Sequence, residues 1–426
     1  MRHLQSKGRV LFLCAELFPS PYAFLGKVFN DLLQLQGFSP IWVMPSMKVN
    51  RLEERDWNGS PLVLIPKMRP KNMHTLMWSY WRHLSYVYAA AHLALRQHGP
   101  FRLIQVRDDP GMAYVAWRLT KKLRVPFVYQ LSHLKEEEYI IYAQRRLYGS
   151  AMNNFIQGRV GLVLRNLFLR KADLVFPISD QMKKTLLQYG VSQDRMVVLP
   201  EGVDTSVEPE VYDDAAKKIR KKLGLEGKKV VIYVGTMNRV RQLEFLLDVF
   251  KQVLYQHPDA HLLMVGDGKI PEDLIWLRSK AVELQIKESV TFTGWVPRDQ
   301  IAIYIRASDI GVSPFPPNKV LINNSPIKLL EYMALEVPVV GTDIPDQRKV
   351  IEESGGGFCV PWRQKAFAKT ITEILSLSEV DRRAIGHRGR IYVQKNRDFS
   401  ICAEIVCEAY DKLLSEERKR CGYCLL

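Results

Sequence analysis

Short apolar runs alternate with helical patterns along the whole chain of 426 residues. In the first half the apolar runs fall at residues 10–14, 41–45, 62–65, 103–106, 127–130 and 174–177, and in the second half at 230–235, 261–265, 290–293, 310–313 and 337–342. Helical patterns lie between them, for example at 243–256 and 327–335. Continuous Val, Ile and Leu strands separated by helices predict parallel sheets covered on both faces. Two such series predict two doubly wound, Rossmann-like α/β domains that face a cleft.

The domain boundary is expected near residues 200–209, where Leu199-Pro200-Glu201-Gly202-Val203-Asp204 leads into a polar stretch. We therefore expect a first domain over 1–203, a second over 204–396, and a C-terminal helix with a basic tail over 397–426. No GxGxxG motif follows the first predicted strand, which disfavours a dinucleotide-dependent dehydrogenase.

The net charge of +16 is concentrated in the first half. Residues 1–204 hold 28 Lys and Arg against 15 Asp and Glu, whereas the remaining residues hold 33 against 30. Two stretches without acidic residues, 57–107 and 139–172, carry this excess. Their basic residues include Lys67, Arg69, Lys71, Arg82, Arg96, Arg102, Arg107, Arg145, Arg146, Arg159, Arg165, Arg170 and Lys171, interleaved with Trp78, Tyr80, Trp81, Tyr139, Ile140, Ile141 and Leu147. The pattern favours peripheral attachment to an anionic membrane surface. The alternative is a pair of ordinary amphipathic helices with solvated basic faces.

No nucleic-acid motif accompanies the charge, so no nucleic-acid partner is expected.

No run reaches the roughly 18 uncharged apolar residues that a membrane-spanning helix needs. The apolar N-terminal run is followed by Glu16 and lacks a cleavage site, so it is interpreted as a strand and not as a signal peptide. Six cysteines are too few for a disulfide framework and suit a reducing cytosol, and no role is expected for Cys421 and Cys424. The sequence predicts a cytoplasmic protein that attaches peripherally to a membrane.

The most informative segment runs from Asn323 to Ala334. Ser325 followed by Pro326 is a strong helix start, with the serine expected at the N-cap and the proline at the first helical position. The free backbone N–H groups of Ile327 and Lys328 would then form a diphosphate site at the helix N-terminus. Glu331, one turn further, can accept hydrogen bonds from two vicinal hydroxyls. Taken alone, the segment is also consistent with a capped helix that carries one glutamate.

Three more loops follow predicted strands in the same half. Gly235 and Thr236 lead to Arg239 and Arg241, which can supply forked donors to phosphate or form a surface pair. Gly266 permits close backbone approach. Trp295 and Val296 follow a further strand end, where a flat base can stack. Together with the helix start, these loops predict one elongated pocket for a nucleoside diphosphate.

Jointly, these motifs resemble the nucleotide-binding domain of retaining glycosyltransferases of the GT-B fold. The family is the large fourth glycosyltransferase family (glycosyl transferases group 1), which contains many lipopolysaccharide, capsule and exopolysaccharide enzymes. The matching segments are 199–204, 235–241, 265–268, 290–294, 307–310 and 325–340. The resemblance covers roughly residues 170–410 well, and the N-terminal half only by pattern.

The resemblance implies roles for the matching residues. Glu331 matches the glutamate that binds the donor ribose, Arg241 falls at the phosphate-binding lysine, and Arg239 stands near a second basic position that Thr236 occupies here. Asn323 replaces the first motif glutamate, although Asn323, Asn324 and the backbone at Ser325 can still hold sugar hydroxyls. Gly26 stands for the glycine pair that follows the first strand. His133 loosely matches a histidine that contacts the donor sugar, and a structural role is the alternative for it.

The implied function is transfer of a hexosyl or N-acetylhexosaminyl group, with retention, from a UDP- or GDP-linked sugar to a lipid-linked or glycan acceptor at the membrane. The first domain would carry the acceptor site, and the C-terminal helix would cross back onto that domain. No metal or other cofactor is expected, because Arg239, Arg241 and the helix N-terminus can stabilise the departing diphosphate. The alternatives are a nucleotide-sugar epimerase or hydrolase on the same fold, and a non-catalytic scaffold that binds nucleotide sugar or membrane, which the replacement at Asn323 keeps open.

Overall fold

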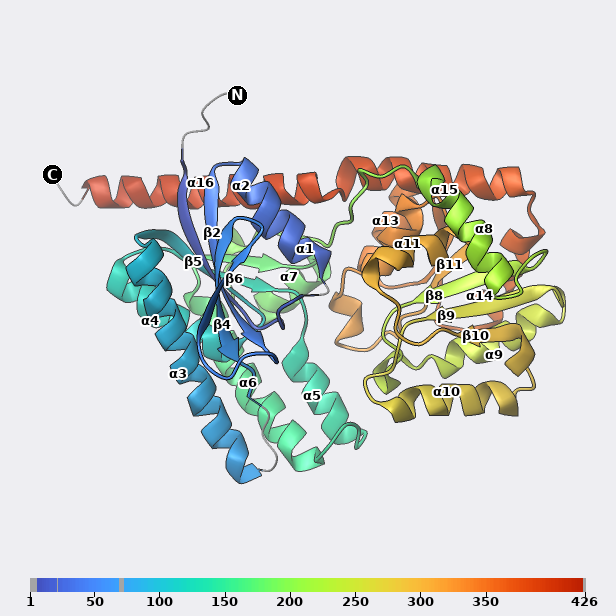
Figure 1. Cartoon of the computed structure of the whole chain (residues 1–426), viewed down its shortest axis with the longest axis horizontal. Coiled ribbons are helices and arrows are strands. Elements are labelled where there is room, and N and C mark those ends of the chain that lie inside the picture. The colour runs from blue at the N-terminus through green and yellow to red at the C-terminus, as the bar shows by residue number, and fades with distance from the viewer. Residues whose placement is uncertain (1–5, 21, 69–72, 424–426) are drawn as a thin grey trace. The chain divides into compact units, whose positions relative to one another are not determined.

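The computed structural model describes residues 6–20, 22–68 and 73–423, without the side chains of 73–77 and 418–423. The chain forms two compact units, one of Met1–Pro200 with Phe399–Leu426 and one of Glu201–Asp398 (Figure 1). We expected the chain to change domain after residues 203 and 396. Arg69, Lys71 and Cys424 of the sequence interpretation, and the side chain of Cys421, lie outside the described part.

The first unit is built on a seven-stranded sheet in the order β3-β4-β2-β1-β5-β6-β7. Its strands are β1 (Gly8–Cys14), β2 (Phe38–Ser46), β3 (Glu53–Trp57), β4 (Ser60–Pro66), β5 (Phe101–Arg107), β6 (Phe127–Leu131) and β7 (Leu174–Pro177). All neighbours are parallel except β3 and β4. The six strands expected in this half are therefore confirmed, and β3 was missed.

The helices of this unit are α1 (Ala23–Gly26), α2 (Leu33–Leu35), α3 (Met73–His98), α4 (Pro110–Leu123), α5 (Lys135–Gln144), α6 (Ala151–Lys171) and α7 (Asp180–Gln188), with a π-helical turn between α1 and α2. Gly26 was expected in the loop after the first strand, but it ends the short helix α1 with ordinary right-handed backbone angles. A Cβ there would approach Trp57 to 3.2 Å, so packing of α1 against β3 explains the glycine.

Helices α5 and α6 form a hairpin around a buried arginine. Glycines at 158 and 161 let α6 approach α5 closely, since a Cβ at Gly158 would lie 2.8 Å from the Glu136 carbonyl oxygen. Arg165 has no exposed surface and donates to Glu136 at 2.8 Å and to Glu137 at 2.6 and 2.8 Å. Burial opposes its charge, but the two carboxylates raise the pKa of Arg165. Its expected place among the membrane-facing basic residues is therefore wrong, as is that of Arg107, which is also buried.

The C-terminal helix α16 (Phe399–Tyr423) completes the core of the first unit. The Tyr410 hydroxyl donates to Gln105 Oε1 at 2.5 Å, and the Phe399 ring meets Phe24 edge-on with centroids 5.9 Å apart. This helix is the crossing element that the resemblance implied, and its pattern was recognised from Asp398 onward.

The second unit holds a fully parallel six-stranded sheet in the order β10-β9-β8-β11-β12-β13. Its strands are β8 (Lys229–Val234), β9 (Ala260–Val265), β10 (Val290–Phe292), β11 (Ile310–Ser313), β12 (Val339–Thr342) and β13 (Gly357–Val360). Its helices are α8 (Asp213–Lys222), α9 (Glu244–Leu254), α10 (Pro271–Glu283), α11 (Arg298–Arg306), α12 (Ile327–Ala334), α13 (Pro345–Ser354), α14 (Gln364–Ser376) and α15 (Glu379–Asn396). All five strands expected here are present, and β13 was missed.

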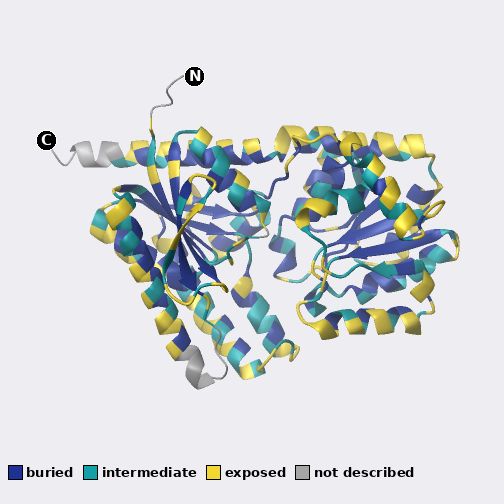
Figure 2. Cartoon of the chain, in the orientation of Figure 1, coloured by how far each residue is buried: buried dark blue, intermediate teal, exposed yellow. Residues whose placement is uncertain are grey.

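Alternating side chains of β8 supply two apolar cores, one on each face of this sheet. The strands at the centre of the sheet are coloured as buried in Figure 2. Val231 and Tyr233 face α9 and α14, whereas Val230 and Ile232 face α12. Two doubly wound units confirm the expected fold class. Within the described residues, no helix is both long and apolar enough to cross a bilayer.

Candidate functional site

Helix α12 begins one residue later than the sequence indicated. Its N-cap is Pro326, with extended backbone angles, and no side chain caps the helix. Ser325 is not the cap because its hydroxyl donates to Asp346 Oδ2 at 2.8 Å. Ile327 and Lys328 are nevertheless in the first turn, where backbone N–H groups have no partner within the helix. The diphosphate site expected there is therefore compatible with the observed helix start.

A buried polar network fixes the entrance to α12. Arg397 donates to Asp346 Oδ1 at 2.9 Å and to the Ser325 hydroxyl at 3.3 Å. The backbone N–H of Glu201 donates to the same hydroxyl at 3.3 Å. Ser325, Asp346, Arg397 and Glu201 are all buried. Charge-assisted bonds of this kind hold the segment before α12 rigidly, so Ser325 has a structural role that its sequence position did not reveal.

Two cations converge on the ring of Phe315, which follows β11. The Lys328 Nζ lies 4.4 Å and the Arg241 guanidinium 5.0 Å from the ring centroid. Burial lowers the pKa of Lys328 well below its ordinary range, Arg241 lowers it further, and Glu331 opposes both. The Nε and Nη1 of Arg241 are buried and, within the described residues, have no hydrogen-bond partner. Two neighbouring cations that are not neutralised by a bonded carboxylate form a favourable place for an anion.

Arg239 is placed differently from Arg241. Its Nε lies 3.4 Å from Asp273, and its guanidinium stacks 3.9 Å above the Trp276 ring. Arg239 therefore has a carboxylate and a ring of its own, whereas Arg241 shares the Phe315 ring with the Lys328 amine. For Lys328 the sequence indicated only a backbone contact. The available signal was a lysine in the first turn of a helix whose only other charged residue is Glu331.

The glycines after β8 and β9 allow this approach. Gly235 has φ +136°, and a Cβ on it would lie 3.4 Å from the Lys328 Cε. Gly266 has φ +132°, and a Cβ on it would lie 2.2 Å from the Gly235 carbonyl oxygen. Both positions therefore favour glycine for backbone conformation, and Gly266 requires it for space as well. Thr236 is exposed beside them, with its carbonyl bonded to the Tyr233 hydroxyl at 3.0 Å.

Glu331 lies one turn into α12 and accepts from Arg298 Nη2 at 3.2 Å. Its second oxygen has no hydrogen bond within the described part of the chain. Trp295, after β10, is 74% exposed, and Val296 packs partly against the core. A flat group can therefore reach the Trp295 ring without any rearrangement of the core.

The two asparagines before α12 differ. Asn323 is buried, and its amide donates to the Lys319 carbonyl at 2.7 Å, so a local turn uses it. The buried Oδ1 of Asn324 has no partner among the described residues. Of the two, Asn324 is therefore the side chain with an acceptor left for a ligand hydroxyl.

In the first unit, His133 follows β6, and its Nε2 lies 3.0 Å from Glu138 Oε2. Half-buried beside this carboxylate, the imidazole is held in one orientation. His133 and Gly26 lie in a different compact unit from the other predicted site residues.

Further charged groups collect at the carboxyl edge of the first sheet, and the sequence reasoning missed them as a set. Glu16 follows β1, Lys67 follows β4, Asp108 follows β5 and Lys135 follows β6. Burial raises the pKa of Glu16, which Arg107 partly opposes. Burial lowers the pKa of Lys67, and the like charge of Lys135 adds to this shift. Within the described part, neither lysine side chain forms an ion pair or hydrogen bond.

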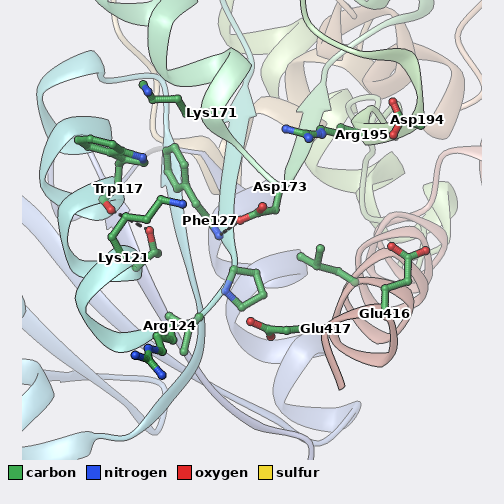
Figure 3. A pocket seen from close by; sticks show the side chains of 14 residues that line it. Trp117, Lys121, Arg124, Phe127, Lys171, Asp173, Asp194, Arg195, Glu416 and Glu417 are labelled. Atoms are coloured by element: carbon green, nitrogen blue, oxygen red, sulfur yellow. Dashed lines mark hydrogen bonds between the residues drawn. The ribbon is translucent and has the colours of Figure 1, made fainter. Parts of the chain in front are cut away.

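A pocket of about 370 Å³ lies at the opposite edge of the first sheet, before β6 and β7 (Figure 3). Trp117, Lys121, Arg124, Asp173 and Arg195 are among the residues that line it. No predicted site residue belongs to it. Among the described residues, no group of three or more His, Cys, Asp or Glu side chains is arranged to hold a metal ion.

Comparisons with known proteins identify the class. The description "Glycosyl transferases group 1" matches residues 215–390, and "Glycosyl transferase 4-like domain" matches 34–202. Sucrose-phosphate synthase from Thermosynechococcus elongatus superposes with a TM-score of 0.73 at 18% identity, over 96% of this chain and 100% of that one. Anabaena HepE in complex with UDP and glucose superposes with a TM-score of 0.68 at 17% identity, over 95% of this chain and 100% of that one.

Alpha-monoglucosyldiacylglycerol synthase of Streptococcus pneumoniae is 23% identical over 327 residues, which are 75% of this chain and 67% of that protein. Two further curated relatives are matched over 63% and 52% of their length. The fold is that of the GT-B glycosyltransferases. The chain belongs to the family of group 1 glycosyl transferases and is a glycosyltransferase.

Proposed function

We propose that this glycosyltransferase moves a sugar, with retention of configuration, from a nucleoside diphosphate sugar to a lipid-linked or glycan acceptor at a membrane. The observation that carries the proposal is the pair of Lys328 and Arg241 over Phe315. A diphosphate beside these cations and the first turn of α12 would receive two charged donors and free backbone N–H groups.

The reaction breaks the bond between the anomeric carbon and the donor phosphate oxygen. Negative charge grows on the departing diphosphate, and Lys328 and Arg241 stabilise it where it grows. The acceptor hydroxyl oxygen forms the new bond on the face that the leaving group vacates. Its proton passes to the departing phosphate oxygen, so this route requires no separate protein base.

The remaining donor contacts extend on both sides of the cations. Glu331 would accept from the ribose hydroxyls with the oxygen that Arg298 leaves free, and Trp295 would cover the base. Asn324 would accept from a sugar hydroxyl with its unbonded Oδ1. HepE has been solved with UDP-glucose, which makes uridine donors the first to be tried.

For the acceptor we propose the polar edge of the first sheet. Lys67 and Lys135 suit an anionic headgroup, because neither side chain forms an ion pair or hydrogen bond with a described residue. The name of the Streptococcus relative, a synthase of a glucosylated diacylglycerol, supports a lipid acceptor. Attachment to a membrane from the cytoplasmic side would bring this edge to such an acceptor.

The test is an assay of the purified chain with UDP- and GDP-sugars and a lipid extract, in which nucleoside diphosphate release and a glycosylated lipid are both measured. The proposal requires both products, with and without a chelator. Release without a glycosylated product would indicate a hydrolase, and an altered donor sugar an epimerase. Binding of UDP without turnover of any donor would indicate a scaffold.

The variant Lys328→Met, beside the exposed control Lys365→Met, links the activity to this site. The first should lose turnover and the second should keep it. Equal activity in both would show that the diphosphate binds elsewhere. Lys67→Ala should raise the KM for the acceptor and leave donor affinity unchanged.

A further inference from the structure

Helix α6 carries a second apolar face that no described element covers. Its inner face packs against α5 and α4 through Asn154, Gly158, Arg165, Phe168 and Leu169. On the opposite face Met152, Ile156, Val160, Val163 and Leu167 are all exposed, Met152 by 60% and Val163 by 68%. Their spacing of three and four residues places them in one row along the helix. An amphipathic helix at an ordinary protein surface would have polar residues in this row.

The charges on this face have one sign. Arg159 and Arg170 are exposed within the row, and no acidic residue occurs between Glu138 and Asp173. Helix α6 contains no Asp or Glu, so Arg159 and Arg170 have no carboxylate on their own helix. The two carboxylates of α5, Glu136 and Glu137, are bound to the buried Arg165. An apolar row with interspersed arginines is complementary to an anionic lipid surface, with acyl chains below and phosphates at the level of the guanidinium groups.

A neighbouring helix repeats the pattern with aromatic residues. On α3, Trp78, Trp81 and Tyr88 are exposed, and the Arg82 guanidinium lies 4.8 Å from the Trp78 ring centroid. Helix α4 packs against both α3 and α6 (Figures 1 and 2). Trp and Tyr concentrate at the boundary between headgroups and acyl chains. They occur here in the same unit as the aliphatic row of α6.

We propose that α6 lies in the plane of an anionic membrane and inserts Met152, Ile156, Val160, Val163 and Leu167 among the lipid chains. The inference deepens the proposed function, because it names the segment that brings a membrane-bound acceptor to the enzyme. It goes beyond attraction by charge, since insertion of an apolar row must leave a component of binding that salt does not remove. Binding of vesicles needs neither donor nor acceptor, so it can be tested even where the proposed reaction fails.

The experiment measures sedimentation of the full chain with vesicles of phosphatidylcholine, alone and mixed with phosphatidylglycerol, at low and high salt. Wild-type protein should bind the anionic vesicles and keep part of that binding at high salt. Val163→Asp should lower the partition coefficient at least about tenfold. The matched control Val380→Asp, at a valine of α15 that is 76% exposed, should bind as the wild type does.

Three outcomes would overturn the proposal. Wild-type binding by Val163→Asp would show that α6 stays outside the bilayer, and complete loss of wild-type binding at high salt would leave charge as the only attraction. A wild-type dimer in solution that Val163→Asp dissociates, without vesicle binding by either, would make the row a subunit interface. UDP binding and the melting temperature should be unchanged in Val163→Asp, which separates this result from misfolding and from failure of the donor site.

Discussion

Both units bury cationic side chains, and they neutralise them differently. In the first unit, Arg165 is bound by Glu136 and Glu137 within the α5–α6 hairpin. In the second unit, Lys328 and Arg241 share the ring of Phe315, and no carboxylate of the described residues is hydrogen-bonded to either. A buried charge is strongly unfavourable unless it is paired. The first arrangement is complete within the protein, whereas the second would be completed by the diphosphate that we propose for it, so we assign structure to the first and propose function for the second.

The largest expected effect is the loss of stability when Arg165 is removed from its cluster with Glu136 and Glu137. Arg165→Met leaves two carboxylates buried without their partner and should reduce the free energy of unfolding by about 3–5 kcal/mol. Thermal denaturation and limited proteolysis of the first unit would measure this loss. Arg170→Met, on the exposed side of the same helix, should change little. If Arg165→Met melted like Arg170→Met, the contrast between the two clusters would be lost.

Replacement of Lys328, in the pair with Arg241 over Phe315, should raise stability and weaken ligand binding. Lys328→Met removes a buried charge and should raise the free energy of unfolding by about 1 kcal/mol or more in the absence of ligand. It should also weaken UDP binding roughly 10- to 100-fold, because a charge-assisted hydrogen bond to phosphate is lost. Calorimetric melting and titration give both quantities. A variant that was less stable and also bound less UDP would mean that Lys328 is structural.

A smaller effect is expected at Glu331. Glu331→Gln should lower affinity for UDP about tenfold, since one charged acceptor of the ribose hydroxyls becomes neutral. The same variant should bind UDP and 2′-deoxy-UDP nearly equally, while wild-type protein prefers UDP. Arg298→Met, which removes the group that Glu331 contacts without ligand, should preserve that preference. Equal discrimination in wild type and Glu331→Gln would place the ribose elsewhere.

The smallest expected effect is the number of protons taken up when UDP binds. The pKa of Lys328 is lowered by burial and by Arg241 in the absence of ligand, and a bound diphosphate should raise it. At pH values above the lowered pKa, UDP binding should therefore take up as much as about one proton. Between that pKa and the ordinary lysine value, the unfolded chain holds the proton that the folded chain has released, so stability rises with pH in this window. Titration calorimetry in buffers of different ionisation enthalpy would measure the uptake, and Lys328→Met should abolish it.

Strands were predicted wherever a run of branched apolar residues is buried on both sides. β3 was missed because Glu53–Trp57 is charged and lies at the sheet edge, although Asn58 and Gly59, both with positive φ, are a recognisable hairpin signal. β13 begins with glycine and lies at the edge of the second sheet, where only Val360 is buried, so no continuous apolar run marks it. The strands that carry an apolar run could be read from the sequence, the edge strands β7 and β10 included, whereas the edge strands β3 and β13, which lack such a run, could not.

The site was predictable where a residue type follows from backbone geometry. Gly235 and Gly266 belong to that class. Phe315 does not, because its contact with Lys328 and Arg241 arises only when the segment after β11, the first turn of α12 and the turn before α9 meet. Arg165 was misplaced for a related reason, since its partners Glu136 and Glu137 lie just before the acid-free stretch in which it was counted. A count of charges along one stretch of sequence does not register ion pairs that form across a helical hairpin.

The path of the chain also sets an order of folding during synthesis. The second unit is one uninterrupted segment, and its ends meet where the Val203 N–H donates to the Arg397 carbonyl at 2.9 Å. The first unit, although it is synthesised first, needs α16 to cover Phe24 and Phe38. A growing chain therefore completes its second unit while the first is still open, the reverse of the usual N-terminal-first order. A chain that stops at Asp398 would keep the second unit intact and expose the aromatic core of the first unit to chaperones and proteases.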